Sequence, residues 1–227
     1  MGERLFKSQD AHKLEDPERL VWLPVADVIR ALGIRPGMHV ADVGVGTGYF
    51  AIPMAQAVAP NGKVYAIDLQ LEMLNMLRGK LERPDAPPNI ELVRGQASKT
   101  MLASKCADVV LIANVWHELD DHEAALQEAA RILVPGGTLA LLDWRPDKNS
   151  PPGPPSDHRL SASDVMQFLT KHDWTTAPPV NIGHYTGRAT VPWPSHRGRL
   201  QTRTDPCESP VPSPAPAPAT CRRPCRA

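Results

Sequence analysis

The sequence has no long hydrophobic run and few cysteines, and both absences narrow what the chain can be. No stretch of about 18 apolar residues occurs in it, so no transmembrane helix is predicted. The N-terminal MGERLFKSQD has no apolar segment of the kind that signal peptides contain. The four cysteines include no C-x-x-C pair or other metal-ligand spacing, which argues against a disulfide framework and predicts no metal site. We expect a cytoplasmic protein.

The chain also has no excess of charge of one sign, since 25 basic residues balance 25 acidic ones. That balance hides a division. Residues 188–227 contain seven Arg, no Lys and only two acidic residues, so the rest of the chain is mildly acidic. A duplex nucleic-acid substrate favours a basic stripe that neutralises its phosphates. The charge pattern therefore argues against nucleic acid as a partner.

Apolar strands alternate with amphipathic helices between residues 35 and 144. The pattern predicts strands over 39–43, 63–68, 89–94, 108–113 and 138–144. Nearly continuous apolar strands separated by helices indicate a mostly parallel sheet with helices on both faces. We therefore predict an α/β, doubly wound, Rossmann-like fold. Ser161 and Asp164 form a capping box that predicts a helix over 162–172, and a sixth strand is predicted over 180–185.

Three glycines at alternate positions follow the first predicted strand, in the segment VADVGVGTGYF. Gly44, Gly46 and Gly48 let the backbone turn sharply and approach a ligand without a Cβ in the way. In open α/β sheets ligands bind at this carboxyl end of the strands. An ordinary tight turn is the alternative interpretation.

The third glycine of the dinucleotide fingerprint is replaced by Tyr49, which disfavours a nicotinamide-dependent oxidoreductase. Asp68, after the second strand, can accept hydrogen bonds from ribose hydroxyls or cap the next helix.

These motifs, DVGVGTGYF, an acid after the second strand and RILVPGGTLAL, resemble class I S-adenosylmethionine-dependent methyltransferases. The likeness is greatest to the small-molecule branch with the ubiquinone/menaquinone-biosynthesis and arsenite types. Within that branch, LEDPERLVWLP, NVWHELDDHE and GPPSDHRLS resemble a "type 11-like" group, over roughly residues 14–186. Cys106 precedes the fourth strand, on the far side from the expected cofactor, which argues against arsenic methylation. The resemblance specifies no acceptor.

The resemblance implies a set of cofactor-binding residues. Asp42 and the loop of Gly44, Gly46 and Gly48 would hold the methionine part and its ammonium group. Asp68 would bind the ribose, and Leu69 would pack beside the adenine. Gln96 and Ala97, after the third strand, would contact the adenine edge, and Asn114 would lie beside the sulfonium.

Two residues after the fourth strand are the catalytic candidates. A base is required only if the acceptor loses a proton, and His117 is the best candidate for it. Glu118 would orient His117 or meet a cationic substrate. The alternative is that His117 is an ordinary turn residue and Glu118 a solvated charge at a helix entry.

We divide the chain into a helical segment, residues 1–34, a cofactor-binding methyltransferase domain, 35–187, and a disordered tail, 188–227. The tail contains nine Pro and three of the four Cys, and its composition cannot form a packed core. The resemblance ends abruptly inside the sheet's last hairpin. We therefore expect a missing or disrupted last strand. A shifted reading frame in GC-rich DNA and a native Pro-rich extension are the two explanations.

The resulting functional prediction is a small-molecule methyltransferase that uses S-adenosylmethionine. The main alternative is a catalytically inactive adenosyl-binding module that acts through a partner.

Overall fold

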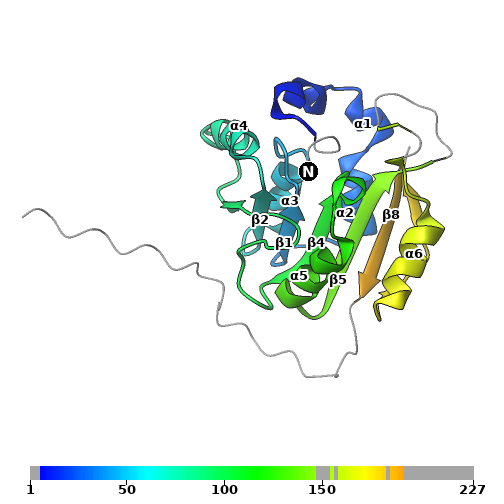
Figure 1. Cartoon of the computed structure of the whole chain (residues 1–227). Coiled ribbons are helices and arrows are strands. Elements are labelled where there is room, and N and C mark those ends of the chain that lie inside the picture. The colour runs from blue at the N-terminus through cyan, green and yellow to red at the C-terminus, as the bar shows by residue number, and fades with distance from the viewer. Residues whose placement is uncertain (1–5, 147–153, 156–157, 183–184, 192–227) are drawn as a thin grey trace, which may run out of the picture.

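The computed structural model describes residues 6–146, 154–155, 158–182 and 185–191. Their strands form one sheet in the order β3-β2-β1-β4-β5-β8-β6, with β7 paired to β8 (Figure 1). The pairs among the first five strands are parallel, whereas β8 runs antiparallel to its partners. The strands are β1 (His39–Val43), β2 (Lys63–Asp68), β3 (Ile90–Arg94), β4 (Ala107–Ala113), β5 (Leu133–Trp144), β6 (Thr175–Thr176), β7 (Val180–Ile182) and β8 (Tyr185–Val191).

Helices cover both faces of the sheet, as the strand pattern predicts. Alternate residues of β1 point to opposite faces: Val40 joins one buried apolar cluster and Ala41 the other. Residues of α2 (Val25–Ala31), α3 (Ala51–Val58) and α4 (Leu71–Leu81) pack in the first cluster. Residues of α5 (His122–Ile132) and α6 (Ala162–Lys171) pack in the second. The doubly wound, Rossmann-like fold is confirmed. Among the described residues, no helix is long and apolar enough to cross a membrane.

The last strand of the sheet corrects the expectation that it is missing or disrupted. The strand β8 lies between β5 and β6, in register from Leu139 opposite Thr190 to Trp144 opposite Tyr185. The strand runs four residues past the boundary placed at residue 187, through Val191. The prediction of one strand over 180–185 was also wrong, since β7 ends at Ile182 and Tyr185 begins β8. Backbone pairing with β5 decides this strand, although it lacks the apolar alternation on which sequence analysis relies. The rest of the predicted tail lies outside the described residues.

The N-terminal segment lies over the carboxyl ends of the parallel strands. We call residues 6–23 the cap; it contains the 3₁₀ helix η1 (Ser8–Glu15) and α1 (Arg19–Trp22), at the top of Figure 1. Lys80 joins it to the domain, because its Nζ donates to Glu15 Oε1 at 2.7 Å and to the Thr47 carbonyl at 2.8 Å. Gln70 Nε2 donates to the Phe6 carbonyl at 2.7 Å. The cap therefore packs directly on the sheet domain.

Candidate functional site

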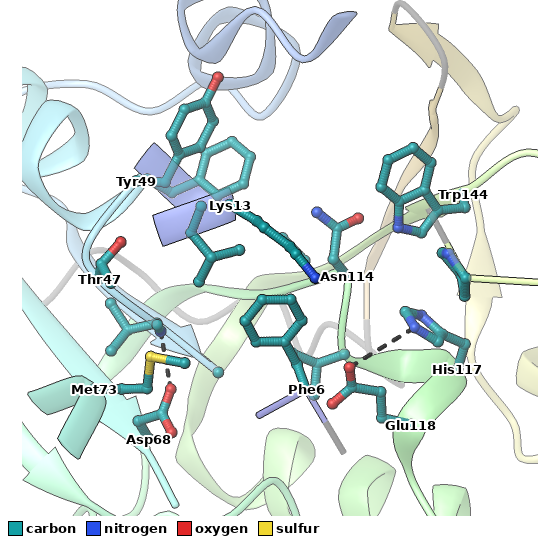
Figure 2. A pocket seen from close by; sticks show the side chains of 18 of the residues that line it. Phe6, Lys13, Thr47, Tyr49, Asp68, Met73, Asn114, His117, Glu118 and Trp144 are labelled. Atoms are coloured by element: carbon teal, nitrogen blue, oxygen red, sulfur yellow. Dashed lines mark hydrogen bonds and ion pairs between the residues drawn. The ribbon is translucent and has the colours of Figure 1, made fainter. Parts of the chain in front are cut away.

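A cavity of about 620 Å³ lies between the cap and the carboxyl ends of β1, β2, β4 and β5. Figure 2 shows Thr47, Asp68 and Met73 on one side of it and His117, Glu118 and Trp144 on the other, with Asn114 between them. Of the residues predicted from the sequence, seven line this cavity: Asp42, Gly44, Gly46, Asp68, Asn114, His117 and Glu118. Residues at the carboxyl ends of three different strands, β1, β2 and β4, are thus brought to one place.

The glycine loop is anchored to the second strand by backbone hydrogen bonds. The amides of Gly44 and Val45 both donate to the Ile67 carbonyl, at 2.8 and 2.9 Å. Gly46 has a φ of +54°, a backbone conformation that is strained for residues with a Cβ. Gly48 has no room for a side chain, because a Cβ there would collide with Leu77. The loop therefore needs glycine both for its turn and for its close packing on α4.

Asp68 holds the glycine loop and the start of α4 at the same time. Its Oδ2 accepts from the Gly46 amide at 2.8 Å, and its Oδ1 accepts from the Gln70 amide at 2.9 Å. Burial raises the pKa of the Asp68 carboxyl, and these backbone donors oppose that rise. A carboxylate has about four lone-pair sites, so these contacts and the Leu69 amide do not use all of them. Asp68 thus orders the loop and the approach to α4, whose N-cap is Gln70 rather than Asp68. Its contact with a ribose stays a prediction.

Asp42 lines the cavity, and it is a buried carboxyl with one unpaired oxygen. Its Oδ2 has no hydrogen-bond partner, and neither has the Oδ1 of Asn114. Burial, followed by the charge of Asp68, raises the pKa of Asp42 to about 7. Buried polar atoms normally have partners. Two lining residues that each carry an unpaired oxygen acceptor therefore suit a ligand that brings hydrogen-bond donors and positive charge.

Four predicted cofactor residues do not line this cavity: Gly48, Leu69, Gln96 and Ala97. Leu69 is 46% exposed beside Asp68. Gln96 forms an isolated bridge with Lys99, and Ala97 packs against the cluster beneath α5. The adenine contacts of Leu69, Gln96 and Ala97, and the part of Gly48 in holding the methionine moiety, remain predictions.

His117 is held by an aspartate that sequence analysis did not single out. The 3₁₀ helix η2 (Trp116–Glu118) carries His117 to the end of β5, where Asp143 lies. His117 Nδ1 is 2.8 Å from Asp143 Oδ1, and the His117 amide donates to Asp143 Oδ2 at 3.1 Å. Burial opposes the charged form of His117, but the hydrogen bond and charge of Asp143, with the charge of Glu118, leave its pKa raised. The imidazole is thus fixed rather than free to rotate.

Glu118 lies on the other side of the His117 ring. Its Oε1 is 3.8 Å from His117 Nε2, which is longer than a hydrogen bond. Burial raises the pKa of Glu118 to about 7, although His117 and the Phe6 backbone amide act in the opposite direction. Glu118 is therefore no solvated surface charge; it links the cavity to the cap.

Aromatic side chains form much of the remaining wall, and sequence analysis missed them. Trp22 and Trp144 lie with ring centroids 5.5 Å apart, and the Arg19 guanidinium lies 3.9 Å from the ring centroid of Tyr49. Asp143 follows the same pattern as Asp68, an acid at the carboxyl end of a parallel strand, and could have been found by it. No such signal marks Phe6 or Trp22, because only the folding of the cap brings them to the cavity.

Comparison with known proteins agrees with this architecture. A family described as "Methyltransferase domain" matches residues 41–141. A SAM-dependent methyltransferase from Aquifex aeolicus superposes with a TM-score of 0.77 at 30% identity, over 82% of this chain and 99% of that one. A putative type 11 methyltransferase from Sulfolobus solfataricus, at 22% identity and a TM-score of 0.60, shares the fold over 78% of this chain and 95% of its own.

A curated relative, the demethylmenaquinone methyltransferase of Listeria welshimeri, is 32% identical over 117 residues. That match covers 52% of this chain and 49% of the relative, so the chain spans about half the length of the curated relatives it matches. Together the fold, the site and the comparisons place the chain in the class I S-adenosylmethionine-dependent methyltransferases. The cofactor of this family is S-adenosylmethionine.

Proposed function

We propose that the protein transfers a methyl group from S-adenosylmethionine to a small molecule with a flat apolar body. The observation that carries the proposal is one cavity with two chemically different sides. We call Asp42, the loop 44–48 and Asp68 the cofactor half. We call His117, Glu118, Asp143 and Trp144 the acceptor half. Asn114 lies between the two halves (Figure 2).

The cofactor half fits S-adenosylmethionine by its unpaired groups. The free Oδ2 of Asp42 suits the cofactor's ammonium group, and the remaining lone pairs of Asp68 suit the ribose hydroxyls. Asn114 Oδ1 adds an acceptor between the halves. Gly44, Gly46 and Gly48 shape the loop, while Leu69, Gln96 and Ala97 are proposed to contact the adenine.

The acceptor half positions a nucleophile and accepts a proton from it. Bound S-adenosylmethionine supplies a methyl group that its positively charged sulfur already activates. Catalysis is therefore largely alignment of the acceptor and exclusion of water. In this proposal His117 is the general base, and the cap excludes water by covering the cavity. Glu118 contacts the acceptor or tunes His117 through its charge.

The wall of the acceptor half suits a flat ring. Trp22 and Trp144 present aromatic surfaces on which such a ring can stack. The Listeria relative is named for demethylmenaquinone, which agrees with an acceptor of this general shape. Arg159 is engaged by the backbone, since its Nε donates to the Pro154 carbonyl at 3.0 Å, which disfavours an anion-binding role for it.

A binding and a product assay test the proposal together. We expect calorimetric titration to detect binding of S-adenosylmethionine but no binding of NAD. An acceptor screen with flat, hydroxyl- or amine-bearing compounds should then release S-adenosylhomocysteine. Binding without any product across the screen would favour the inactive adenosyl-binding module, and binding of NAD alone would contradict both hypotheses.

A further inference from the structure

The most informative cluster outside the predicted set joins β5 to η2. Asp143 contacts His117 at two atoms, the ring Nδ1 at 2.8 Å and the backbone amide at 3.1 Å. The Trp144 amide also donates to Asp143 Oδ1, at 2.8 Å. Each carboxylate oxygen thus accepts from a backbone N–H. With both oxygens engaged as acceptors, Asp143 is the acceptor toward the imidazole as well, so Nδ1 carries the proton.

We infer that Asp143 is the positioning residue of this site: it holds the Nδ1–H of His117 and thereby presents an unprotonated Nε2 to the acceptor. This inference rests on the proposed function for the identity of the reaction. The contact with the backbone amide fixes the place of His117, and the contact with Nδ1 fixes the orientation and tautomer of its ring. Without this partner the neutral imidazole could carry its proton on Nε2 instead, and Nε2 could then not act as a base.

The distance on the other side of the ring supports this assignment. Glu118 Oε1 is 3.8 Å from Nε2, too far to accept a hydrogen bond from it, so no carboxylate holds a proton on Nε2. The Nε2 lone pair thus remains available to an O–H or N–H of the acceptor. The proton would move from the acceptor atom to Nε2, and the electron pair left on that atom would form the bond to the incoming methyl group.

The charged groups around His117 act in opposite directions. Asp143 on β5 and Glu118 on η2 favour the imidazolium, whereas burial and the charge of Arg159 disfavour it. The two carboxylates raise the affinity of His117 for a proton. Because His117 acts as a base only when it is neutral, a higher pH is then needed to deprotonate it. Activity should therefore rise with pH through the pKa of His117.

Nitrogen NMR of the intact chain tests the inference without an acceptor. Long-range proton–nitrogen spectra of His117, assigned with His117→Gln, should show a protonated Nδ1 and an unprotonated Nε2 in the neutral form. Asp143→Asn should lower the pKa of His117 and increase the Nε2–H tautomer. Asp121→Asn is the matched control, because Asp121 also accepts from a backbone amide, that of Ala124 at 2.8 Å, but caps α5 instead. A wild-type ring with its proton on Nε2, or an Asp143→Asn ring that titrates like wild type, would overturn the inference.

Turnover on an identified acceptor gives a second readout. Asp143→Asn should lower kcat and move the acid limb of its pH profile to lower pH, with cofactor affinity within twofold of wild type. An unshifted acid limb contradicts the inference even if kcat falls, since a purely structural loss lowers the profile without moving it. A chain that shows the expected tautomer but binds no S-adenosylmethionine would contradict the proposed function and leave the positioning of His117 established.

Discussion

The two halves of the cavity are built in different ways. The cofactor half comes from one continuous strand–loop–helix–strand unit, residues 39–68, and backbone hydrogen bonds from Gly44 and Val45 to Ile67 hold its loop. The acceptor half comes from segments far apart in the chain, since His117 and Asp143 are 26 residues apart and the cap is further away still. The loop tolerates few substitutions because its glycines have positive φ, whereas side chains on separate segments can vary independently. The acceptor half can therefore change without disturbing the loop.

Loss of the glycine loop should have the largest effect on the cofactor half. We expect Gly46→Val to abolish S-adenosylmethionine binding, because valine is strained at a φ of +54° and its Cβ would lie 3.2 Å from Leu14 Cδ1. Calorimetric titration measures this. Gly79→Val in α4 is the control, since a Cβ there meets nothing within 4 Å. Normal binding by the Gly46 variant would contradict the placement of the cofactor.

Removal of the base should affect chemistry and not binding. His117→Ala should lower turnover on an identified acceptor by about 10²–10⁴-fold, the usual contribution of general acid–base catalysis. Its affinity for S-adenosylmethionine should stay within twofold of wild type. Product release assays and titration on the same preparation measure the two quantities. A variant with normal turnover would return His117 to the role of a turn residue.

Asp68 sharpens the comparison, because it serves both the loop and the ligand. Asp68→Ala should weaken S-adenosylmethionine binding by about 1.5–3 kcal/mol, the scale of hydrogen bonds to a charged group. Asp68→Asn should lose less, since its remaining carbonyl oxygen can still accept from Gly46 or Gln70. Equal isotherms for the two variants and wild type would exclude Asp68 from the site.

Asp42 should make cofactor binding depend on pH. Its pKa of about 7 means that the carboxyl is neutral at lower pH and cannot pair with the ammonium group. If only the ionised form binds, affinity should fall by about tenfold between pH 8 and pH 6. Titrations of wild type and Asp42→Asn at both values test this, because the cofactor's own ionisation is common to both. A variant with the wild-type pH dependence would contradict the assignment.

The cap should contribute the smallest effect. Lys80→Met removes the donor to Glu15 and to the Thr47 carbonyl, a partly exposed contact that we expect to stabilise the closed cap by about 1 kcal/mol or less. The cofactor should then dissociate up to about fivefold faster in stopped-flow experiments. Arg30→Met is the control, because its exposed pair with Asp27 lies on α2. An unchanged rate would mean that the cap does not retain the cofactor.

The sequence by itself determined the parallel sheet and its helices on both faces, and it placed the loop 44–48 and Asp68 at the carboxyl ends of β1 and β2. Apolar periodicity marks buried strands and helix faces, and the loop 44–48 and Asp68 belong to one local unit. The predicted strands over 39–43 and 63–68 match β1 and β2. Ser161 is also confirmed as the N-cap of α6, since its side chain accepts from the Asp164 amide.

Only the tertiary structure decided the acceptor half and the end of the sheet. The contact of His117 with Asp143 depends on β4 and β5 lying side by side, and Phe6 and Trp22 reach the cavity only because the cap folds over it. Residues 188–191 complete a strand because the backbone of β5 offers hydrogen-bonding groups to pair with. Such pairing depends on backbone atoms that every residue carries, so the side-chain pattern of the sequence did not show it.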